Sequence, residues 1–473
     1  MKNRIYTNEI MTREGKDVAL AGWIEARRDH GKLIFLDLRD KKGIVQVVIT
    51  PKQKDAYEAA KDVRDEWVLQ INGTVQKRPD NMVNPDIETG RHEIGVKEIK
   101  ILSKAETLPF PIDTAGYDIS EELRLKYRYL DLRRKRLNEN ISLRSELIRR
   151  VRNFLFEEDF TEIETPLLTK STPEGARDFL VPSRIYPGKF FALPQSPQQY
   201  KQLLMVAGFE KYFQIARAVR DEDLRADRGF EHTQIDMEMS FADREEVMEL
   251  NERMITAVFE NLGMKLKEKP FPVLTYREAM DKFKSDRFDM RSEKDKKNNV
   301  LAFAWVVDFP FFEKDDSGRW TFTHNPFSQP KEEFVEDLIA GKNIENILTT
   351  QYDLVCNGYE VGGGSIRAHD PRVLQAVLKI MGYSEKETEE GFGHMLEAFK
   401  YGAPPHGGIA YGVERLLMIL KNEEYLREVQ AFPQTGSGRT SVMDAPSEAG
   451  EQLLKELNIK IIKNAKRKKN KNK

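Results

Sequence analysis

The stretch from Gln195 to Asp236 constrains the fold of this chain more than any other, and its first part predicts a short helix. In QSPQQYKQLLMVAGF, Ser196 can cap the helix, Pro197 suits its first position and Gly208 can end it. The side chains at positions 198 and 201 are then expected to share one face of the first turn.

Two β-rich runs follow this helix, at 212–220 and 232–240, and a loop crowded with charge joins them. The loop alternates acidic and basic side chains too densely for them to be buried without partners: Arg220, Asp221, Glu222, Asp223, Arg225, Asp227 and Arg228. From composition alone, a solvated hairpin tip and a site for a charged ligand are equally good interpretations.

The same stretch resembles a known family. QSPQ-x-x-KQLLM and FQIARAVRDEDLRADR-x-x-E-x-TQID are similar, without a gap, to the substrate helix and second signature motif of bacterial class II aspartyl-tRNA synthetases. The resemblance implies an α+β protein, in which an N-terminal OB-fold β-barrel precedes a class II catalytic domain built on an antiparallel sheet flanked by helices.

The resemblance also implies an activity and its partners. Enzymes of this family activate L-aspartate with ATP and Mg2+, forming aspartyl-adenylate and pyrophosphate. They then transfer aspartate to the 3′ end of tRNA-Asp, and in some relatives also of tRNA-Asn. We therefore expect an AMP-forming aminoacyl-tRNA ligase that works as a homodimer.

The composition agrees with this interpretation. Lys plus Arg number 76 against 78 Asp plus Glu, so local patches rather than a global basic field would hold a nucleic acid. The single Cys356 excludes a disulfide framework, and the seven His show no zinc-finger spacing. No signal segment and no run of about eighteen apolar residues occurs, so we expect a cytoplasmic protein without membrane contact.

Residues 18–101 predict five short strands and one helix, with a tight turn at 40–43. This pattern is typical of a closed OB-type barrel, a fold often used on single-stranded nucleic acid. Phe35 taken alone is more often a core residue, but beside Arg28 it could stack on a base. RRD-x-G-x-LIF-x-D-x-RD resembles the family's anticodon-binding barrel, which implies anticodon contacts for Arg28, Phe35 and Gln46.

Two further positions in this region bear on the choice of tRNA. His30 resembles the relaxed enzymes that charge both tRNA-Asp and tRNA-Asn, whereas Asn81 stands where that type commonly has Gly. Whether tRNA-Asn is also charged therefore stays open.

The chain divides by composition into four parts. We expect an OB-fold domain over 1–104, a hinge over 105–140, a catalytic domain over 141–462 and a Lys-rich tail over 463–473. The basic run KYRYLDLRRKR in the hinge fits a solvated face or contact with tRNA phosphates, and the resemblance favours phosphate. An amphipathic helix over 141–156, followed by the extended FTEIETPLL, resembles the first class II motif, which forms the dimer interface in relatives.

Two segments of the expected catalytic domain bear on function. TPEGARDF, at 172–179, resembles the mobile loop that closes over the amino acid, which implies that Glu174 reaches toward the substrate's ammonium. Near 281–301, a short connection stands where bacterial relatives carry a large extra domain. That domain lies away from the chemistry in relatives, so its absence is expected to leave activity intact.

Asn357-Gly358 in DLVCNGYEVGGGSIR is a strong hairpin signal. The hairpin sets Glu360 opposite Val355 and places Asp353 diagonally on the same face. One magnesium could there bridge the two carboxylates or a shared phosphate. Gly362–Gly364 permits a bulge and a close approach of a nucleotide to the backbone.

GGIAYGVERLLMIL, at 407–420, predicts a Gly-rich strand that leads into an apolar helix with Arg415 in its first turn. Packing does not explain Arg415, and the run resembles the third class II motif, which implies that Arg415 binds ATP. Glu414 stands where many relatives have Asp.

The resemblance distributes roles over all these segments, with Arg220, Glu360 and Arg415 as the catalytic residues and positioning as the main source of catalysis. The implied aspartate-binding residues are Glu174, Ser196, Gln198, Lys201, Arg220, Asp236, His324 and Arg367. The implied ATP-binding residues are Arg220, Asp221, Glu222, His232, Glu360, Gly412, Val413, Glu414 and Arg415. The implied metal ligands are Asp353 and Glu360.

Selecting aspartate over asparagine requires buried cations that face the side-chain carboxylate. Arg367 and Lys201 fit this role, with His324 as a third donor, and an amide there can be rejected by ~10⁴-fold. We predict that Arg367→Leu loses aspartate-dependent pyrophosphate exchange while leaving the fold intact.

Two departures from the family concern adenine. Relatives usually have Gln at Gly229 and an adenine-stacking Phe at His232, so His232 or Phe230 would have to supply the stacking surface. Two alternatives to the aspartate enzyme also stay open: an asparagine-charging relative, and a catalytically silent RNA-binding protein of the same fold.

Overall fold

The computed structural model describes residues 3–172 and 175–462, and these form two compact units, Met1–Pro111 and Ile112–Lys473. Glu174 and the Lys-rich tail at 463–473 lie outside the described residues. The expected hinge at 105–140 is divided, because the chain from Ile112 onward belongs to the second unit. No helix in the described part of the chain is long and apolar enough to cross a membrane.

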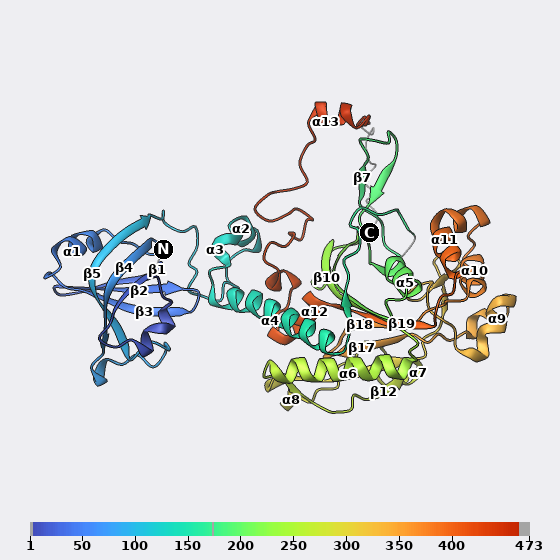
Figure 1. The fold of residues 1–473 in the computed structure, drawn as a ribbon, viewed down its shortest axis with the longest axis horizontal. Helices are drawn as coiled ribbons and strands as arrows, with labels where there is room; N and C mark the ends of the chain where they lie inside the picture. The colour runs from blue at the N-terminus through green and yellow to red at the C-terminus, as the bar shows by residue number, and fades with distance from the viewer. Residues whose placement is uncertain (1–2, 173–174, 463–473) are drawn as a thin grey trace, which may run out of the picture. The chain divides into compact units, whose positions relative to one another are not determined.

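The first unit is the predicted closed barrel, with strand order β1-β2-β3-β5-β4 (Figure 1). Burial alternates along β2 as expected for a strand with one face inward, and each strand contributes a fully buried side chain: Leu20, Leu36, Val47, Leu69 and Ile94. The elements of this unit are η1 (Thr7–Thr12), β1 (Asp17–His30), β2 (Leu33–Asp40), β3 (Gly43–Ile49), α1 (Lys54–Lys61), β4 (Val68–Lys77), η2 (Asp80–Met82) and β5 (His92–Ser103).

The second unit is built on an eight-stranded sheet with the order β12-β14-β17-β18-β19-β10-β9-β6. Its inner strands are antiparallel as expected, but β12 runs parallel to β14 and β6 parallel to β9. The predicted antiparallel sheet is therefore present, and it becomes mixed only at its two edges, where short strands enter from loops. The strands are β6 (Thr161–Glu162), β9 (Lys211–Val219), β10 (Glu231–Ser240), β12 (Val273–Thr275), β14 (Phe303–Val307), β17 (Tyr352–Cys356), β18 (Tyr359–Ile366) and β19 (His406–Gly412).

Short strand pairs and helices surround this sheet. The pairs are β7 (Leu180–Pro182) with β8 (Phe190–Ala192), β11 (Lys265–Leu266) with β13 (Val300–Leu301), and β15 (Phe312–Lys314) with β16 (Trp320–Phe322). The helices are α2 (Glu121–Lys126), α3 (Arg128–Asp131), α4 (Lys135–Glu157), α5 (Gln198–Val206), α6 (Arg244–Asn261), α7 (Tyr276–Phe283), α8 (Glu293–Lys297), η3 (Glu332–Phe334), α9 (Val335–Ala340), η4 (Ile344–Asn346), α10 (Pro371–Ile380), α11 (Glu385–Phe399), α12 (Val413–Lys421), η5 (Leu426–Val429) and α13 (Glu451–Glu456).

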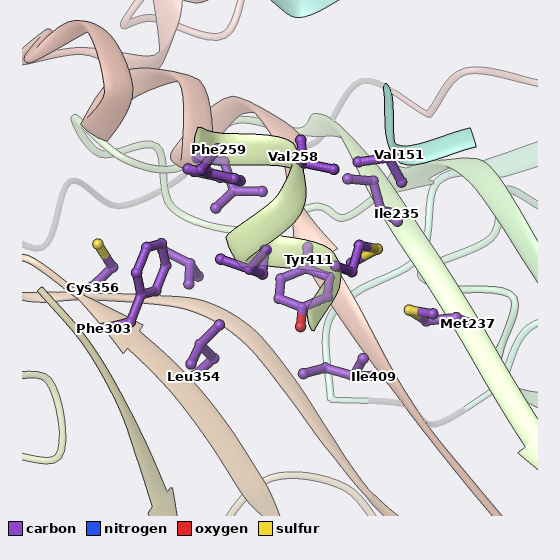
Figure 2. Close-up of a cluster of buried hydrophobic side chains, with 14 of the residues drawn as sticks. Val151, Ile235, Met237, Val258, Phe259, Phe303, Leu354, Cys356, Ile409 and Tyr411 are labelled. Atoms are coloured by element: carbon purple, nitrogen blue, oxygen red, sulfur yellow. The ribbon is translucent and has the colours of Figure 1, made fainter. Parts of the chain in front are cut away.

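One face of the sheet carries the hydrophobic core, and α4, α6 and α12 contribute to it. Ile235 and Met237 of β10 lie in this core, and Figure 2 shows them with Tyr411 of β19 and Phe259 of α6. Side chains alternate along a strand, so Asp236 and Glu238 point to the opposite face. The period of two in the sequence of β10 thus separates core from site.

The predicted helix at the start of the site is α5, and it begins one residue later than expected. Pro197 is its N-cap, and the hydroxyl of Ser196 accepts a hydrogen bond from the backbone N–H of Gln198 at 3.2 Å. Gly208 follows the helix with a φ of +84°, a conformation that glycine adopts without strain. The helix α4 is longer than predicted, since it starts at Lys135 rather than at 141.

The hairpin over β17 and β18 has the predicted register, with Val355 opposite Glu360 and a bulge between Leu354 and Val355. Its glycines have a structural reason that the sequence did not reveal. A Cβ on Gly364 would lie 2.0 Å from the carbonyl oxygen of Gly408 on β19. The strands therefore approach closely at this point, whatever binds above them.

Two arginines of the basic run expected to contact tRNA phosphates are buried, whereas Lys126 and Lys135 of the same run are exposed. Arg128 and Arg134 are fully buried, and both pair with Asp131, at 2.8 and 2.7 Å. Arg124 pairs with Asp131 and, at 2.7 Å, with Glu428. The phosphate role was therefore wrong for Arg128 and Arg134, because a guanidinium enclosed with its own carboxylates cannot reach an external anion. These pairs join the start of the second unit to its C-terminal part.

Candidate active site

Four buried charged side chains lie on the face of the sheet opposite the core, and we call them the charge quartet: Lys201 of α5, Asp236 and Glu238 of β10, and Arg367 just after β18. The Nζ atom of Lys201 lies 2.8 Å from Asp236 Oδ2 and 3.2 Å from Glu238 Oε2. Arg367 binds Glu238 through two nitrogens, with Nε 2.8 Å from Oε1 and Nη2 3.1 Å from Oε2. Two cations and two anions thus balance in a buried site.

The pKa values of the two carboxylates of the quartet shift in opposite directions. Burial would raise the pKa of Glu238, but Arg367 and Lys201 outweigh burial and bring that pKa down to about 2. For Asp236 burial prevails over the attraction of Lys201, so its pKa is raised. Asp236 Oδ1 is buried and has no hydrogen-bond donor among the described residues. An orphan carboxylate oxygen of this kind requires a donor from a ligand or water.

The unused donors of the quartet suit one carboxylate group. Lys201 has three N–H donors, of which two face the quartet's carboxylates. Arg367 has five, and four of them point to Glu238, the hydroxyl of Ser365 and the carbonyl of Gly408. Each cation therefore keeps one N–H without a partner in the described part of the chain, and two such donors match the two oxygens of a carboxylate.

Gln198 lies on the first turn of α5, as predicted, one turn before Gln202. Its Nε2 donates to Gln202 Oε1 at 3.1 Å. The hydroxyl of Ser196 is engaged with the backbone at the start of this helix. Gln198 and Lys201 thus belong to the same short element, which fixes their separation.

Asp353 and Glu360 lie near each other, as the hairpin register predicts. Burial raises the pKa of Glu360, and the charge of Asp353 raises it further against the attraction of Arg415. His324 Nε2 lies 3.2 Å from Asp353 Oδ2, and Arg287 lies 3.1 Å from Glu360. Two carboxylates that repel each other suit a divalent cation whose other ligands are phosphates and waters. No group of three or more His, Cys, Asp or Glu in the described residues could hold a metal without such help.

His324 was expected beside Arg367 and Lys201, but its contact is with Asp353 instead. Burial would lower the pKa of His324, and Asp353 and Glu360 raise it overall. His324 therefore lies at the carboxylate pair and serves that end of the site.

Cationic side chains lie at the end of the site where the resemblance implies ATP binding. The side chain of Arg220 is held by its Nε, which donates to the carbonyl of Gln195 at 3.1 Å, and its Nη atoms have no partner among the described residues. Arg415 donates to the carbonyl of Glu360 at 2.6 Å and to Asp227 at 3.1 Å. Burial lowers the pKa of His232 to about 3, and Arg220, Arg415 and Arg217 add to this effect, so the ring is neutral near pH 7.

The side chain of Phe230 packs against neighbouring residues. This matters for adenine binding, because this chain has Gly229 and His232 where relatives usually have a Gln and an adenine-stacking Phe. Its ring meets Phe179 edge-on, with centroids 5.4 Å apart, and a Cβ on Gly438 would touch it at 3.0 Å. The side chain of Gln434 accepts from the N–H of Phe230 at 3.2 Å, next to Gly229. Phe230 is therefore held by packing, and His232 is the ring on which Arg220 and Arg415 act electrostatically.

Other predicted ATP contacts are placed as follows. Both oxygens of Glu414 are used inside the protein, by Arg144 at 2.8 Å and by the N–H of Thr233 at 2.9 Å. Its side chain is not available to ATP. Gly412 is the N-cap of α12 and Val413 is fully buried, so these two positions offer only backbone. The backbone N–H of Asp221 donates to the carbonyl of Arg177 at 3.0 Å, and Glu222 lies 3.6 Å from Arg228.

In the barrel unit, the predicted anticodon residues share one face. Arg28 of β1 stands directly opposite Phe35 of β2, and Asp37 stands opposite Gln46 of β3. Arg28 is exposed and binds Asp37 through two nitrogens, at 2.6 and 2.8 Å. Gln46 is buried and donates to Glu93 at 2.9 Å, so an incoming base would have to replace that bond. His30 and Asn81 are both exposed.

Glu238 is the functional residue that the sequence analysis missed. It stands two positions after Asp236, and Gln234, Asp236 and Glu238 together form a polar face at strand spacing. This alternation could have identified Glu238, because a carboxylate that is buried on a central strand must be paired with a cation.

A closed OB-type barrel and a mixed sheet that carries this charged pocket together define a tRNA synthetase of class II. The family described as "tRNA synthetases class II (D, K and N)" matches residues 120–436, and an "OB-fold nucleic acid binding domain" matches residues 18–102. The chain belongs to this class II family.

Relatives agree over nearly the whole chain. The chain is 42% identical to a protein of Caldanaerobacter subterraneus named "Aspartate--tRNA(Asp/Asn) ligase", over 94% of this chain and 96% of the relative. It is 39% identical to a Staphylococcus saprophyticus protein named "Aspartate--tRNA ligase", over 94% of this chain and 97% of the relative. The aligned span of 571 positions with the first is longer than this whole chain, so that relative carries residues that are absent here.

Solved structures show the same fold. An asparaginyl-tRNA synthetase from Pyrococcus horikoshii has a TM-score of 0.72 at 24% identity, and covers 92% of this chain and 99% of its own. An aspartyl-tRNA synthetase from Leishmania major, described as putative, has a TM-score of 0.74 at 20% identity, and covers 92% and 94%.

Proposed function

We propose that the protein is an aspartate–tRNA ligase, which activates L-aspartate with ATP and transfers it to tRNA. The names of its relatives support this function, and one observation in the site carries the amino-acid specificity. The charge quartet keeps two N–H donors, on Lys201 and Arg367, for a carboxylate, and one orphan acceptor, Asp236 Oδ1, for an ammonium.

Aspartate fits this pattern better than asparagine does. Its side-chain carboxylate accepts from both remaining donors, whereas an amide would place its NH2 group against one of them. Buried donors that are left unpaired or opposed are costly, which is how such sites can reject an analogue by ~10⁴-fold. The asparagine-charging alternative is disfavoured on this ground.

Activation requires the carboxylate of the amino acid to approach the α-phosphate, and both are anions. The Nη atoms of Arg220, which have no partner among the described residues, would donate to these two anions. Arg415 would add a second positive charge. Neutral His232 supplies a ring for adenine without adding a third cation. No protein nucleophile is needed, because alignment and charge neutralisation can supply most of the rate enhancement.

Magnesium fits the Asp353 and Glu360 pair, whose mutual repulsion a divalent cation would relieve. When bound there, it would neutralise charge on the phosphates. His324 and Arg287, which contact the two carboxylates, would hold them in place.

The tRNA would bind through two surfaces, the outer face of the barrel at Arg28 and Phe35 and the catalytic pocket itself. The relatives have two different names. Some are named aspartate--tRNA(Asp/Asn) ligase, and others are named aspartate--tRNA ligase. The proposal includes tRNA-Asp as a substrate, and charging assays with both purified tRNAs decide on tRNA-Asn. Such an enzyme would act in the cytoplasm.

The experiment that tests the function is pyrophosphate exchange with aspartate and with asparagine. We expect exchange only with aspartate. Arg367→Lys is a better test variant than Arg367→Leu, because the lysine retains a charge beside buried Glu238 while losing the fork that binds it. Exchange in this variant should fall by orders of magnitude. Absence of aspartate-dependent exchange in the wild-type protein would overturn the proposal and favour the silent RNA-binding alternative.

We further propose a homodimer formed through an apolar patch around the short strand pair β7 and β8, which we call the edge patch: Leu167, Leu168, Leu180 and Phe190. Each of these side chains is between 49% and 57% exposed. Pairing of Thr169 and of Leu180 with Ala192 brings the members together. Patches of this kind on a sheet edge mark association sites. Leu167→Lys with Leu168→Lys should yield a monomer in sedimentation experiments, and an unchanged dimer would rule out this surface.

A further inference from the structure

A chain of hydrogen bonds connects the start of β19 to helix α5, the helix that carries Gln198 and Lys201. It runs from the carbonyl of Pro404 through His406, at the start of β19, to Gln202 and Gln198 on α5. His406 Nδ1 lies 2.7 Å from the carbonyl oxygen of Pro404, and His406 Nε2 lies 3.1 Å from Gln202 Nε2. Gln202 Oε1 accepts from Gln198 Nε2 at 3.1 Å. Both His406 and Gln202 are completely buried.

The direction of every bond in this chain follows from its first member. A carbonyl oxygen can only accept, so His406 Nδ1 must carry the proton. In the neutral ring Nε2 is then an acceptor, so Gln202 must turn its NH2 group toward it. The carbonyl oxygen of Gln202 consequently faces Gln198 and receives its NH2 group. The carbonyl oxygen of Gln198 remains, and it has no partner among the described residues.

We propose that Gln202 and His406 are positioning residues that hold the amide of Gln198 with its oxygen toward the ammonium of the bound amino acid. This inference rests on the proposed function, in which Asp236 accepts from that ammonium, and it adds Gln198 as a second acceptor on the same side of α5 as Lys201. An amide that turned the other way would present NH2 to a cation. The chain of bonds therefore decides whether Gln198 attracts or repels the substrate.

The state of His406 controls this orientation. Burial lowers the pKa of His406, and Arg367 and His369 add to the lowering, while Glu238 on β10 and the Pro404 carbonyl act against it. The ring of Phe399 on α11, 6.4 Å away, carries no charge. His406 is accordingly neutral near pH 7. Below this lowered pKa its Nε2 gains a proton and becomes a donor, which turns Gln202 and then Gln198.

The test compares the KM for aspartate in pyrophosphate exchange, from about pH 5.5 to 8, in wild type, Gln202→Met and Gln202→Glu. We expect the wild-type KM to rise as the pH falls below the ordinary histidine range. In Gln202→Met the orientation is lost, so KM should be about tenfold higher at neutral pH and should lose this acid rise. The KM for ATP should not change, since the chain does not reach the nucleotide.

Gln202→Glu should keep the orientation of Gln198. Its carboxylate accepts from Gln198 and shares a proton with His406 at every pH, so KM should stay near the wild-type value without the acid rise. If Gln202 only fills space, the ranking reverses, because Met matches its shape and a buried Glu does not. His324 also titrates with a raised pKa, but it is unchanged in all three proteins, so its effect cancels in the comparison.

The outcomes are separable. Wild-type protein without aspartate-dependent exchange would overturn the proposed function itself. Normal exchange with an unchanged KM and an intact acid rise in Gln202→Met would overturn only the positioning role. If Gln202→Glu does not fold, as judged by thermal melting, the Met variant alone decides. Gln452→Met on exposed α13 is the matched control, and its KM should equal that of wild type.

Discussion

Replacement of Glu238 by Gln tests the charge quartet most directly. The carboxylate of Glu238 is fully buried and receives three charged contacts, two from Arg367 and one from Lys201. Glutamine offers only one oxygen, and its NH2 group would face N–H donors. The variant would also leave two buried cations opposite a single carboxylate, that of Asp236.

Two independent arguments give a similar loss of folding free energy for Glu238→Gln. The pKa of Glu238 is brought from 4.5 to about 2, and at 1.36 kcal/mol per pH unit this corresponds to about 3 kcal/mol of folding free energy. Breaking a buried ion pair by removing one partner typically costs about 3–5 kcal/mol. For a unit as large as Ile112–Lys473, with an unfolding entropy of ~2.1 cal/mol/K per residue, 3 kcal/mol lowers Tm by about 4 °C.

The pH dependence has a definite sign. The folded pKa of Glu238 is depressed, so its stabilisation is present above 4.5 and is lost as the pH falls toward about 2. The Tm difference between wild type and Glu238→Gln should therefore be full at pH 6 and above and should shrink below pH 4.5.

Thermal melting and pyrophosphate exchange measure both consequences. The control is Glu245→Gln, an exposed glutamate on α6 whose loss should change stability by less than about 0.5 kcal/mol. Because Arg367 loses its anchor, aspartate-dependent exchange in Glu238→Gln should fall by about 100-fold. A variant that melts and exchanges like the control would refute the idea that Glu238 balances the two cations.

Three further predictions concern other parts of the chain. Asp131→Asn removes the carboxylate shared by three buried arginines, so denaturant unfolding should show a loss of about 3–5 kcal/mol. Gly364→Ala should destabilise by about 3 kcal/mol or more, because its Cβ would collide with Gly408, whereas Gly436→Ala meets nothing within 4 Å and should be neutral in the same experiment. Arg28→Ala should raise the KM for tRNA by about tenfold or more, and should leave pyrophosphate exchange unchanged because Arg28 lies in the separate barrel unit.

Local patterns predicted much of the fold. The register of the β17–β18 hairpin followed from Asn357-Gly358, since both residues adopt positive φ as a tight hairpin turn requires. The closed barrel followed from alternation within short strands. These features depend on neighbours in sequence, which is why a single sequence was sufficient to predict them.

Features that depend on distant partners were missed or misjudged. The basic run suggested an exposed face because Glu428, which pairs with Arg136, is 292 positions away. Glu414 stands at the acidic position of the third motif, which suggested a contact with ATP. Its carboxylate instead binds Arg144, which lies on another helix. Sequence composition counts charges and cannot reveal which of them neutralise each other.

The sequence was sufficient to locate the site but not to identify all of its charged residues, because their partners are distant in the chain. Lys201, Asp236 and Arg367 were each identified, and together they would carry one excess positive charge in a buried place. Burial of an unbalanced charge is too costly to persist, so a second carboxylate had to lie within reach. Glu238 is that group, and the balance it creates leaves Lys201 and Arg367 each with a single donor to offer. The specificity for a carboxylate therefore depends as much on the partners that occupy these cations as on the cations themselves.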